Sequence, residues 1–188
     1  MLRLQLDPKL SLDPASLVAR LRQLFVDCAR VTRQIQAPPV CRVDLNGTAQ
    51  VITVNTNAVI TFLSAGTHAL DTHGWWSDTT YQYTPKESGY YAVYLQAEIY
   101  KDSDTVDAAA TTVIAIRKNA TIETQAKWVS LPAVTSAMLN VQTIVWLDGA
   151  TDYLDFVVNY TASTGLALYG GYNRTSATVQ FLGADALA

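Results

Sequence analysis

The chain has 188 residues, of which 49% are hydrophobic and 15% are charged, with ten Tyr, four Trp and four Phe. This composition excludes a disordered chain, and the length allows one domain with a sizeable core plus an appendage. Residues 1–36 hold six Lys/Arg against three Asp/Glu, and the remainder holds seven against thirteen, which gives +3 and −6 within the net charge of −3. An acidic body repels polyanions, so a nucleic acid partner is not expected. Because few charges cover the aromatic residues, part of the apolar surface is expected to be hidden against other subunits.

Secretion and membrane insertion are not expected from the sequence. Met1–Asp7 has neither the continuous apolar core nor the small-residue cleavage site of a signal peptide. No apolar run approaches the ~18 residues that a membrane span needs. Cys28 and Cys41 are too few for a disulfide scaffold and are expected to be reduced thiols.

The first segment, residues 1–12, carries alternating leucines at Leu2, Leu4 and Leu6 and is too short to fold alone. It is expected either to be an attachment peptide that docks onto a larger assembly or to be a frayed terminus.

Residues 13–37 are predicted to form a helical stem, because Asp13 is a good N-cap and Pro14 suits the first helical position. Apolar residues then recur at spacings of 4, 3, 4, 3 and 4, which is a heptad pattern. Val18 and Phe25 widen the apolar stripe, which favours more than two helices or packing against a body. Two hypotheses remain open, a short trimeric coiled coil and an amphipathic helix that lies on its own domain. The heptad positions, and the candidate residues of a trimer stem, are Leu17, Leu21, Leu24, Cys28, Val31 and Ile35.

After Pro38-Pro39, residues 40–188 are predicted to form one all-β head, because the hydrophobic period changes to two and no helix intervenes. Eight or nine antiparallel strands in this length indicate a sandwich or jelly roll. The predicted strands are Gln50–Asn55, Ala58–Leu63, Thr79–Pro85, Gly89–Lys101, Thr111–Lys118, Thr121–Ser130, Ala137–Leu147, Asp152–Thr161 and Thr175–Leu182.

Two of these strands are expected to be covered on both faces, so they are candidates for the centre of the head. Pro85 and Gly89 form a turn that feeds Gly89–Lys101, whose odd positions are apolar and whose even positions are amphipathic. Ala137–Leu147 is apolar on both faces, which is typical of a strand that contacts its own core on one side and a neighbouring subunit on the other.

Five segments between about residues 50 and 184 carry a resemblance to a known family. The segments are Val59–Phe62, Tyr83–Tyr91, Ile114–Asn119, Leu147–Gly149 with Asp152–Leu154, and Ser176–Gly183. In this order they resemble the trimeric jelly roll of the complement one-q globular head and the tumour necrosis factor ligands, as used in bacteriophage fibre and head-decoration proteins. The most specific is the Thr-Pro to Gly-Tyr segment, and Ala120 departs from the pattern because phage-like sequences often have Gly there.

This resemblance implies a homotrimer whose inner strands pack aromatic and aliphatic side chains around a threefold axis. The side chains expected at the trimer interface of the head are Tyr90, Tyr94, Trp146 and Phe156.

Motifs for catalysis, metal or cofactor binding are not found. His68 and His73 share a loop but lack a metal-binding spacing, and the acidic group Asp102, Asp104 and Asp107 lacks the glycine and terminal Glu of a calcium loop. No nucleophile elbow and no phosphate-binding loop is present. The chain is therefore expected not to be an enzyme and to hold no cofactor.

Four loop aromatics, Trp75, Trp76, Tyr169 and Tyr172, are candidates for binding a ligand. Exposed aromatic side chains can stack on sugar rings or anchor a protein interface. The alternative is that they fill the ends of the barrel or the trimer seam.

The function expected from these features is that of a homotrimeric bacteriophage fibre, spike or capsid-decoration protein, located in the virion and assembled in the host cytoplasm. The N-terminus would bind other virion proteins, and the head would bind a glycan or protein on the host surface. The alternatives are a secreted trimeric signalling or recognition ligand of the same fold, and a carbohydrate-binding module.

Overall fold

The structure is a computed structural model that describes residues 14–36, 38–53, 55–65, 69–101, 110–129, 136–161, 166–170 and 174–184. The chain divides into two compact units, Met1–Pro38 and Pro39–Ala188, which we name the stem and the head. The predicted attachment peptide lies outside the described residues.

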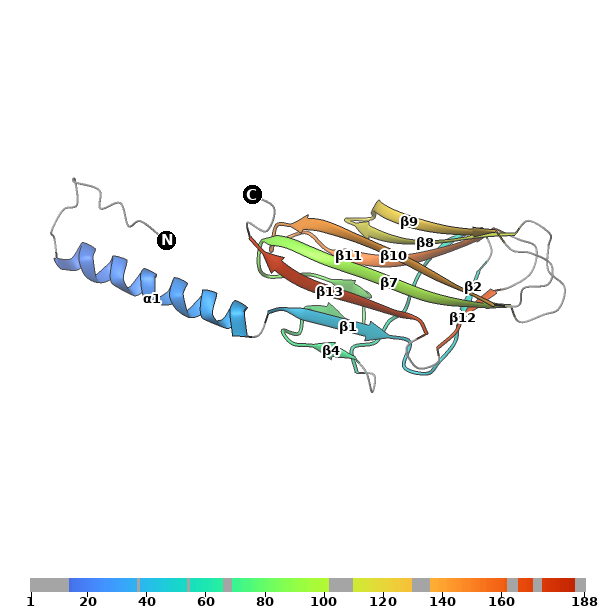
Figure 1. Ribbon diagram of the computed structural model, residues 1–188, viewed down its shortest axis with the longest axis horizontal. Helices are drawn as coiled ribbons and strands as arrows, with labels where there is room; N and C mark the ends of the chain where they lie inside the picture. Colours follow the sequence, from blue (N-terminus) through green and yellow to red (C-terminus); the bar gives the residue numbers. More distant parts are fainter. Residues whose placement is uncertain are drawn as a thin grey trace. The chain divides into compact units, whose positions relative to one another are not determined.

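The stem contains one helix, α1, which spans Pro14–Gln36 as predicted (Figure 1). Its apolar side chains are exposed, from 45% at Leu21 to 74% at Phe25. The side chains of Val31 and Ile35 lie outside the described residues. Among the described helical residues, no segment is long and apolar enough to span a membrane.

The described strands of the head form two antiparallel sheets, and β7 is the central strand of sheet A. In this sheet the strand order is β2-β12-β7-β13-β1-β4, and β10 also pairs with β7. The strands β10, β7, β13 and β1 lie side by side in Figure 1. The bounds in sheet A are β1 Val40–Asp44, β2 Gln50–Ile52, β4 Leu70–Asp71, β7 Gly89–Lys101, β10 Ser136–Leu147, β12 Leu166–Leu168 and β13 Ser176–Gly183.

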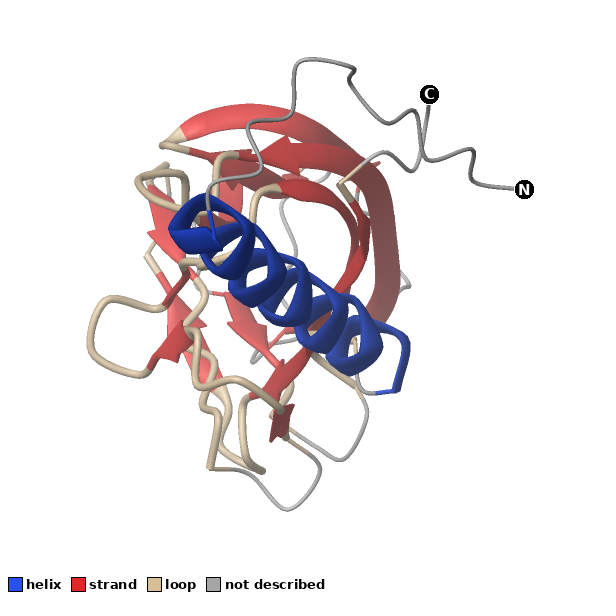
Figure 2. Ribbon diagram, turned by 90° about the vertical axis from the view of Figure 1, so that its left-hand side faces the viewer, coloured by secondary structure: helices blue, strands red, loops and turns tan. Residues whose placement is uncertain are grey.

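Sheet B has the strand order β5-β6-β11-β8-β9, and β3 pairs with β11. Viewed along the strands, the curved sheets of the head face one another (Figure 2). The fold is therefore the predicted all-β antiparallel jelly-roll sandwich, preceded by one helix. The bounds in sheet B are β3 Asn57–Val59, β5 Trp76–Ser77, β6 Gln82–Tyr83, β8 Thr111–Lys118, β9 Thr121–Val129 and β11 Leu154–Thr161.

The core lies between the sheets and is rich in aromatic side chains. The odd positions of β7 from Tyr91 to Ile99 face it, and each of these side chains is at most 2% exposed. Phe62, Phe156 and Trp76 form one aromatic cluster, with centroid distances of 5.7 Å for Phe62–Phe156 and 6.1 Å for Trp76–Phe156. A second series of ring contacts links Trp75 to Tyr83, Tyr83 to Tyr91, and Tyr91 to Phe181. The contact between Tyr83 of β6 and Tyr91 of β7 joins sheet B to sheet A.

Several predicted strands are shorter than expected because the backbone turns. The strand predicted at Gln50–Asn55 ends at Ile52, and Asn55 adopts a positive φ of 58°. The strand predicted at Thr79–Pro85 is reduced to Gln82–Tyr83, because Tyr81 has a φ of 56° and its N–H donates to the Ser77 carbonyl. Four strands were not predicted, namely β1, β4, β5 and β12.

Candidate functional site

The candidate site is the outer face of sheet A, formed by the even positions of β7 and the residues beside them. Trp146 pairs with Tyr90, Ile144 with Ala92 and Gln142 with Tyr94 across the β10–β7 ladder. Residues directly opposite one another in an antiparallel pair share a face. The predicted interface residues Tyr90, Tyr94 and Trp146 are therefore brought together on one surface.

This outer face is hollowed above Ala92. The small alanine lies between Ile144 of β10 and Gln180 of β13, and Tyr94 stands beside it. The hollow has a volume of about 490 Å³ and is lined by Ala92, Val93, Tyr94, Gln142, Thr143, Ile144, Thr178 and Gln180. None of these side chains is charged, so a partner could cover the hollow without removing a charge from water.

The hydroxyl of Tyr94 is held within the face. Tyr94 Oη lies 2.7 Å from Asn140 Oδ1 and 3.1 Å from Gln96 Oε1. Its donor already has an acceptor in a single chain, although the residue is 36% exposed. Covering Tyr94 would therefore not leave its hydroxyl donor unpaired.

Trp146 is also held in place, by Lys118 at the end of β8. Lys118 Nζ donates to the Trp146 carbonyl at 2.9 Å and lies 5.5 Å from the centroid of the indole ring. The same ammonium pairs with Asp152 Oδ2 at 2.8 Å. Because Trp146 is 46% exposed yet fixed, it could contact a partner with little loss of conformational entropy.

Asp148 and Asp152 shape the loop that follows Trp146 and Leu147. Burial raises the pKa of Asp152, but hydrogen bonds from Lys118, Asn119 and the Asp148 N–H outweigh it, so the net shift is downward. The pKa of Asp148 is also lowered, first by the Thr151 hydroxyl and then by backbone N–H groups. Both carboxylates are held as hydrogen-bond acceptors, which is a structural role.

The prediction that Phe156 lies at the trimer interface is wrong. Its side chain is 0% exposed, because β11 directs it between the sheets against Phe62 and Trp76. The residue leaves no surface for another subunit.

The ligand-binding hypothesis for Trp75 and Trp76 is also wrong. These side chains are 8% and 7% exposed and belong to the core, in line with the alternative that they fill the sandwich. Asp71 accepts hydrogen bonds from the N–H groups of Gly74 and Trp76 at 3.0 and 2.8 Å. These bonds close the loop and direct the indoles inward.

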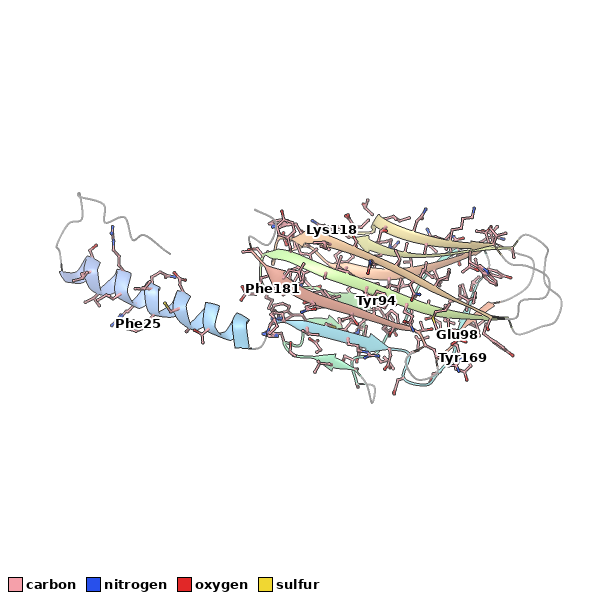
Figure 3. The ribbon with its side chains drawn as sticks, viewed as in Figure 1. Phe25, Tyr94, Glu98, Lys118, Tyr169 and Phe181 are labelled. Carbon is pink, nitrogen blue, oxygen red and sulfur yellow. The ribbon has the colours of Figure 1, made fainter. Side chains whose placement is uncertain are left out.

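Tyr169 is 41% exposed and lies beside residues that the sequence did not indicate. Arg174 Cζ lies 4.7 Å from the centroid of its ring, and the ring of Tyr100 meets it at 6.5 Å. Arg174 also pairs with Glu98. In Figure 3, Glu98 and Tyr169 lie together at the end of the head where β7 finishes, away from Tyr94. Tyr172 lies outside the described residues.

The described part of the chain contains no group of three or more His, Cys, Asp or Glu side chains that could hold a metal ion. His73 Nδ1 lies 2.7 Å from the Thr72 hydroxyl, and its ring contacts Trp75. His68, Asp102, Asp104 and Asp107 fall outside the described residues.

Comparisons with known proteins extend the description of the fold. No protein-family model matches the chain, and no curated protein matches its sequence. Among solved structures, the chain is similar to the Eiger tumour necrosis factor of S. frugiperda, with a TM-score of 0.52 and 16% sequence identity. The match covers 78% of this chain and 94% of that one. The head is therefore a jelly roll of the tumour necrosis factor type.

Proposed function

We propose that this protein is a homotrimeric virion structural protein, namely a bacteriophage fibre, spike or capsid-decoration protein. The observation that carries the proposal is the outer face of sheet A, where fixed and exposed aromatic and aliphatic residues surround an uncharged hollow. Ile144 and Trp146 are 52% and 46% exposed in one chain. A second copy that covered this face would remove that apolar area from water.

The stem supports the same assembly. Leu17, Leu21 and Leu24 repeat with heptad spacing and are 46%, 45% and 56% exposed. In a parallel three-stranded coiled coil these stripes would bury one another, and three stems would emerge together from three heads. The virion location follows from the resemblance of the head sequence to phage fibre and decoration proteins, with the N-terminal segment as the part that binds the particle.

The first test is the mass of the protein in solution, measured for the full chain and for a truncated protein that begins at Val40. A trimer that survives truncation would place the association energy in the head, and a trimer that dissociates would place it in the stem. A full chain that stays monomeric at micromolar concentration would exclude the proposal.

The stem can be tested separately through its exposed cysteine. Cys28 occupies an a position of the heptad, so three copies would meet at the axis of a parallel coiled coil. Mild oxidation is expected to join two of three chains covalently, and Cys28→Ser is expected to abolish the product. Cys41 is buried and does not compete. A trimer without this product would mean that the stems do not align.

A test of the virion location requires isolated virus particles. An antibody raised against the head is expected to label intact particles at regular positions in electron micrographs, and labelling is expected to disappear from particles that lack the protein. Particles that assemble with no copies of it would contradict a structural role.

A second candidate is a secreted trimeric signalling or recognition ligand, which the similarity of the fold to a tumour necrosis factor supports. The two candidates differ in location. A protein found in culture medium in the absence of particles would favour the ligand.

A further inference from the structure

The described surface carries a second group of fixed and exposed aromatic residues, at the end of the head opposite the entry of the chain. Val40, the first residue of β1, pairs with Gln180, which pairs with Ala92 of β7. Glu98 and Tyr100 lie six and eight residues further along β7, roughly 20 and 27 Å away at ~3.3 Å per residue.

The group consists of Glu98, Tyr100, Tyr169 and Arg174, which we name the tip platform. Figure 3 labels Glu98 and Tyr169 of this group. Arg174 Nη1 donates to both carboxylate oxygens of Glu98, at 2.7 and 2.8 Å. Its guanidinium lies over the ring of Tyr169, and the rings of Tyr100 and Tyr169 meet edge to face at 72°. The backbone is locked as well, because the Tyr169 N–H donates to the Glu98 carbonyl at 2.9 Å and the Glu98 N–H donates to the Arg174 carbonyl at 3.1 Å.

The tip platform is preorganised and yet open to solvent. Tyr100 is 43% and Tyr169 is 41% exposed. In the monomer, the ion pair, the ring contacts and two backbone hydrogen bonds fix the rings, so a ligand need not order them. Both bonds to Glu98 use Nη1 of Arg174. A guanidinium carries further N–H groups, which can donate to a hydroxyl ligand.

The chemistry of the tip platform selects its ligand class. A pyranose presents an apolar ring face that suits a tyrosine ring, and hydroxyl groups that suit a guanidinium edge and a carboxylate. Glu98 neutralises the charge of Arg174, and residues 37–188 carry a net charge of −6. An anionic glycan would therefore gain little electrostatic attraction at the tip platform. Four side chains are too few for a protein interface, which typically needs ~20–30 residues on each side.

We infer that the tip platform binds a neutral pyranose of a surface glycan. The inference rests on the proposed function, since it names the ligand class through which a trimeric virion protein would adhere. One platform supplies few contacts, so each site is weak. Three platforms on one trimer would bind a repeating glycan much more tightly than one.

The test uses the full-length protein on surfaces coated with glucan, galactan or mannan, with a polyuronate surface as the anionic comparison. The wild-type protein is expected to bind at least one neutral polymer in preference to the polyuronate. Tyr169→Ala is expected to weaken binding at least about tenfold, because it removes the stacking ring. Tyr169→Phe keeps that ring and is the matched control, expected to bind within about threefold of the wild type.

Each result has a defined meaning. If the wild type is a trimer, its failure to bind any neutral polymer, or equal binding by Tyr169→Ala, would overturn the inference. The solution mass of every variant is measured in parallel. A protein that is trimeric but binds no glycan would refute the glycan site and leave the proposed trimer intact. If the wild type is a monomer, saturation-transfer NMR with methyl glucoside, galactoside and mannoside reads the single site directly. Signal in the wild type that Tyr169→Ala abolishes would support the platform, and absence of signal for all three would refute it.

Discussion

Replacement of Trp146 by alanine tests the proposed interface most directly. The residue is 46% exposed in one chain. A Trp side chain carries roughly 250 Å² of surface, so full coverage in a trimer would bury about 115 Å² more, worth about 3 kcal/mol per subunit at ~25 cal/mol per Å². For three subunits the loss is about 9 kcal/mol, which raises the trimer dissociation constant about a million-fold. The protein concentration at which half of the trimer dissociates scales as the square root of this dissociation constant, so it would rise about a thousand-fold.

Sedimentation velocity over a dilution series measures this concentration for the wild type and Trp146→Ala. Val51→Ala is the control, because Val51 is 78% exposed on β2, far from Trp146 along the sheet. The head should stay folded in Trp146→Ala, since the neighbouring Val145 and Leu147 supply the buried face of β10. An unchanged half-dissociation concentration, with a trimer still present, would refute this face as the interface.

Three further predictions concern the turns of the head. Ala120→Gly should raise the free energy of unfolding by roughly 0.5–1 kcal/mol, seen as a higher urea midpoint, because a Cβ is unfavourable at its φ of 64°. Gly149→Ala should lower that free energy by more than about 2 kcal/mol in thermal melts, because Gly149 has a φ of 71° and the new Cβ would clash with the Ser88 nitrogen. Asp148→Asn should reduce the loss of stability on acidification. The folded pKa of Asp148 lies below its unfolded value, so its contribution is complete above pH ~4 and is lost as pH falls from there toward the folded pKa.

These turn predictions can each fail in a distinct way. A lower urea midpoint for Ala120→Gly would mean that the entropy lost by glycine on folding outweighs relief of the left-handed backbone. A melt of Gly149→Ala equal to the wild type would mean that the loop moves away from Ser88. Identical acid unfolding curves for Asp148→Asn and the wild type would mean that its hydrogen bonds persist in the unfolded chain.

The sequence predicted the elements whose hydrophobic period is long. Helix α1 and the strands β7, β8 and β10 were anticipated within two residues at each end, because their patterns span eight or more positions. The buried face of β7 also followed, since its odd positions are uniformly apolar. Strands of two or three residues, such as β4, carry no period that can be read, and their pairing depends on the fold around them.

The candidate site was predicted only in part, because a surface requires strand register. Tyr90, Tyr94 and Trp146 could be identified as aromatic residues on the two strands that were expected to be covered on both faces. The hollow could not, since it depends on small Ala92 lying between Ile144 and Gln180, which are distant in sequence. For the indoles of Trp75 and Trp76, the sequence left two hypotheses open, ligand binding on an exposed loop and filling of the barrel ends or the trimer seam. Their burial follows from the loop closure at Asp71, which has no sequence period.

The polar groups on the outer face of sheet A bear on whether this face can be buried at all. An interface formed from exposed amides and hydroxyls usually loses free energy when those groups are separated from water. Here the Tyr94 hydroxyl already lies 2.7 Å from Asn140, and the Lys118 ammonium is already paired with Asp152 beside Trp146. The Tyr94 hydroxyl and the Lys118 ammonium are thus paired before association. The exposed surface of Ile144 and Trp146 beside them is apolar. Association through this face would gain hydrophobic free energy without leaving these polar groups unpaired, which is why we place the interface there and the ligand site at the tip platform.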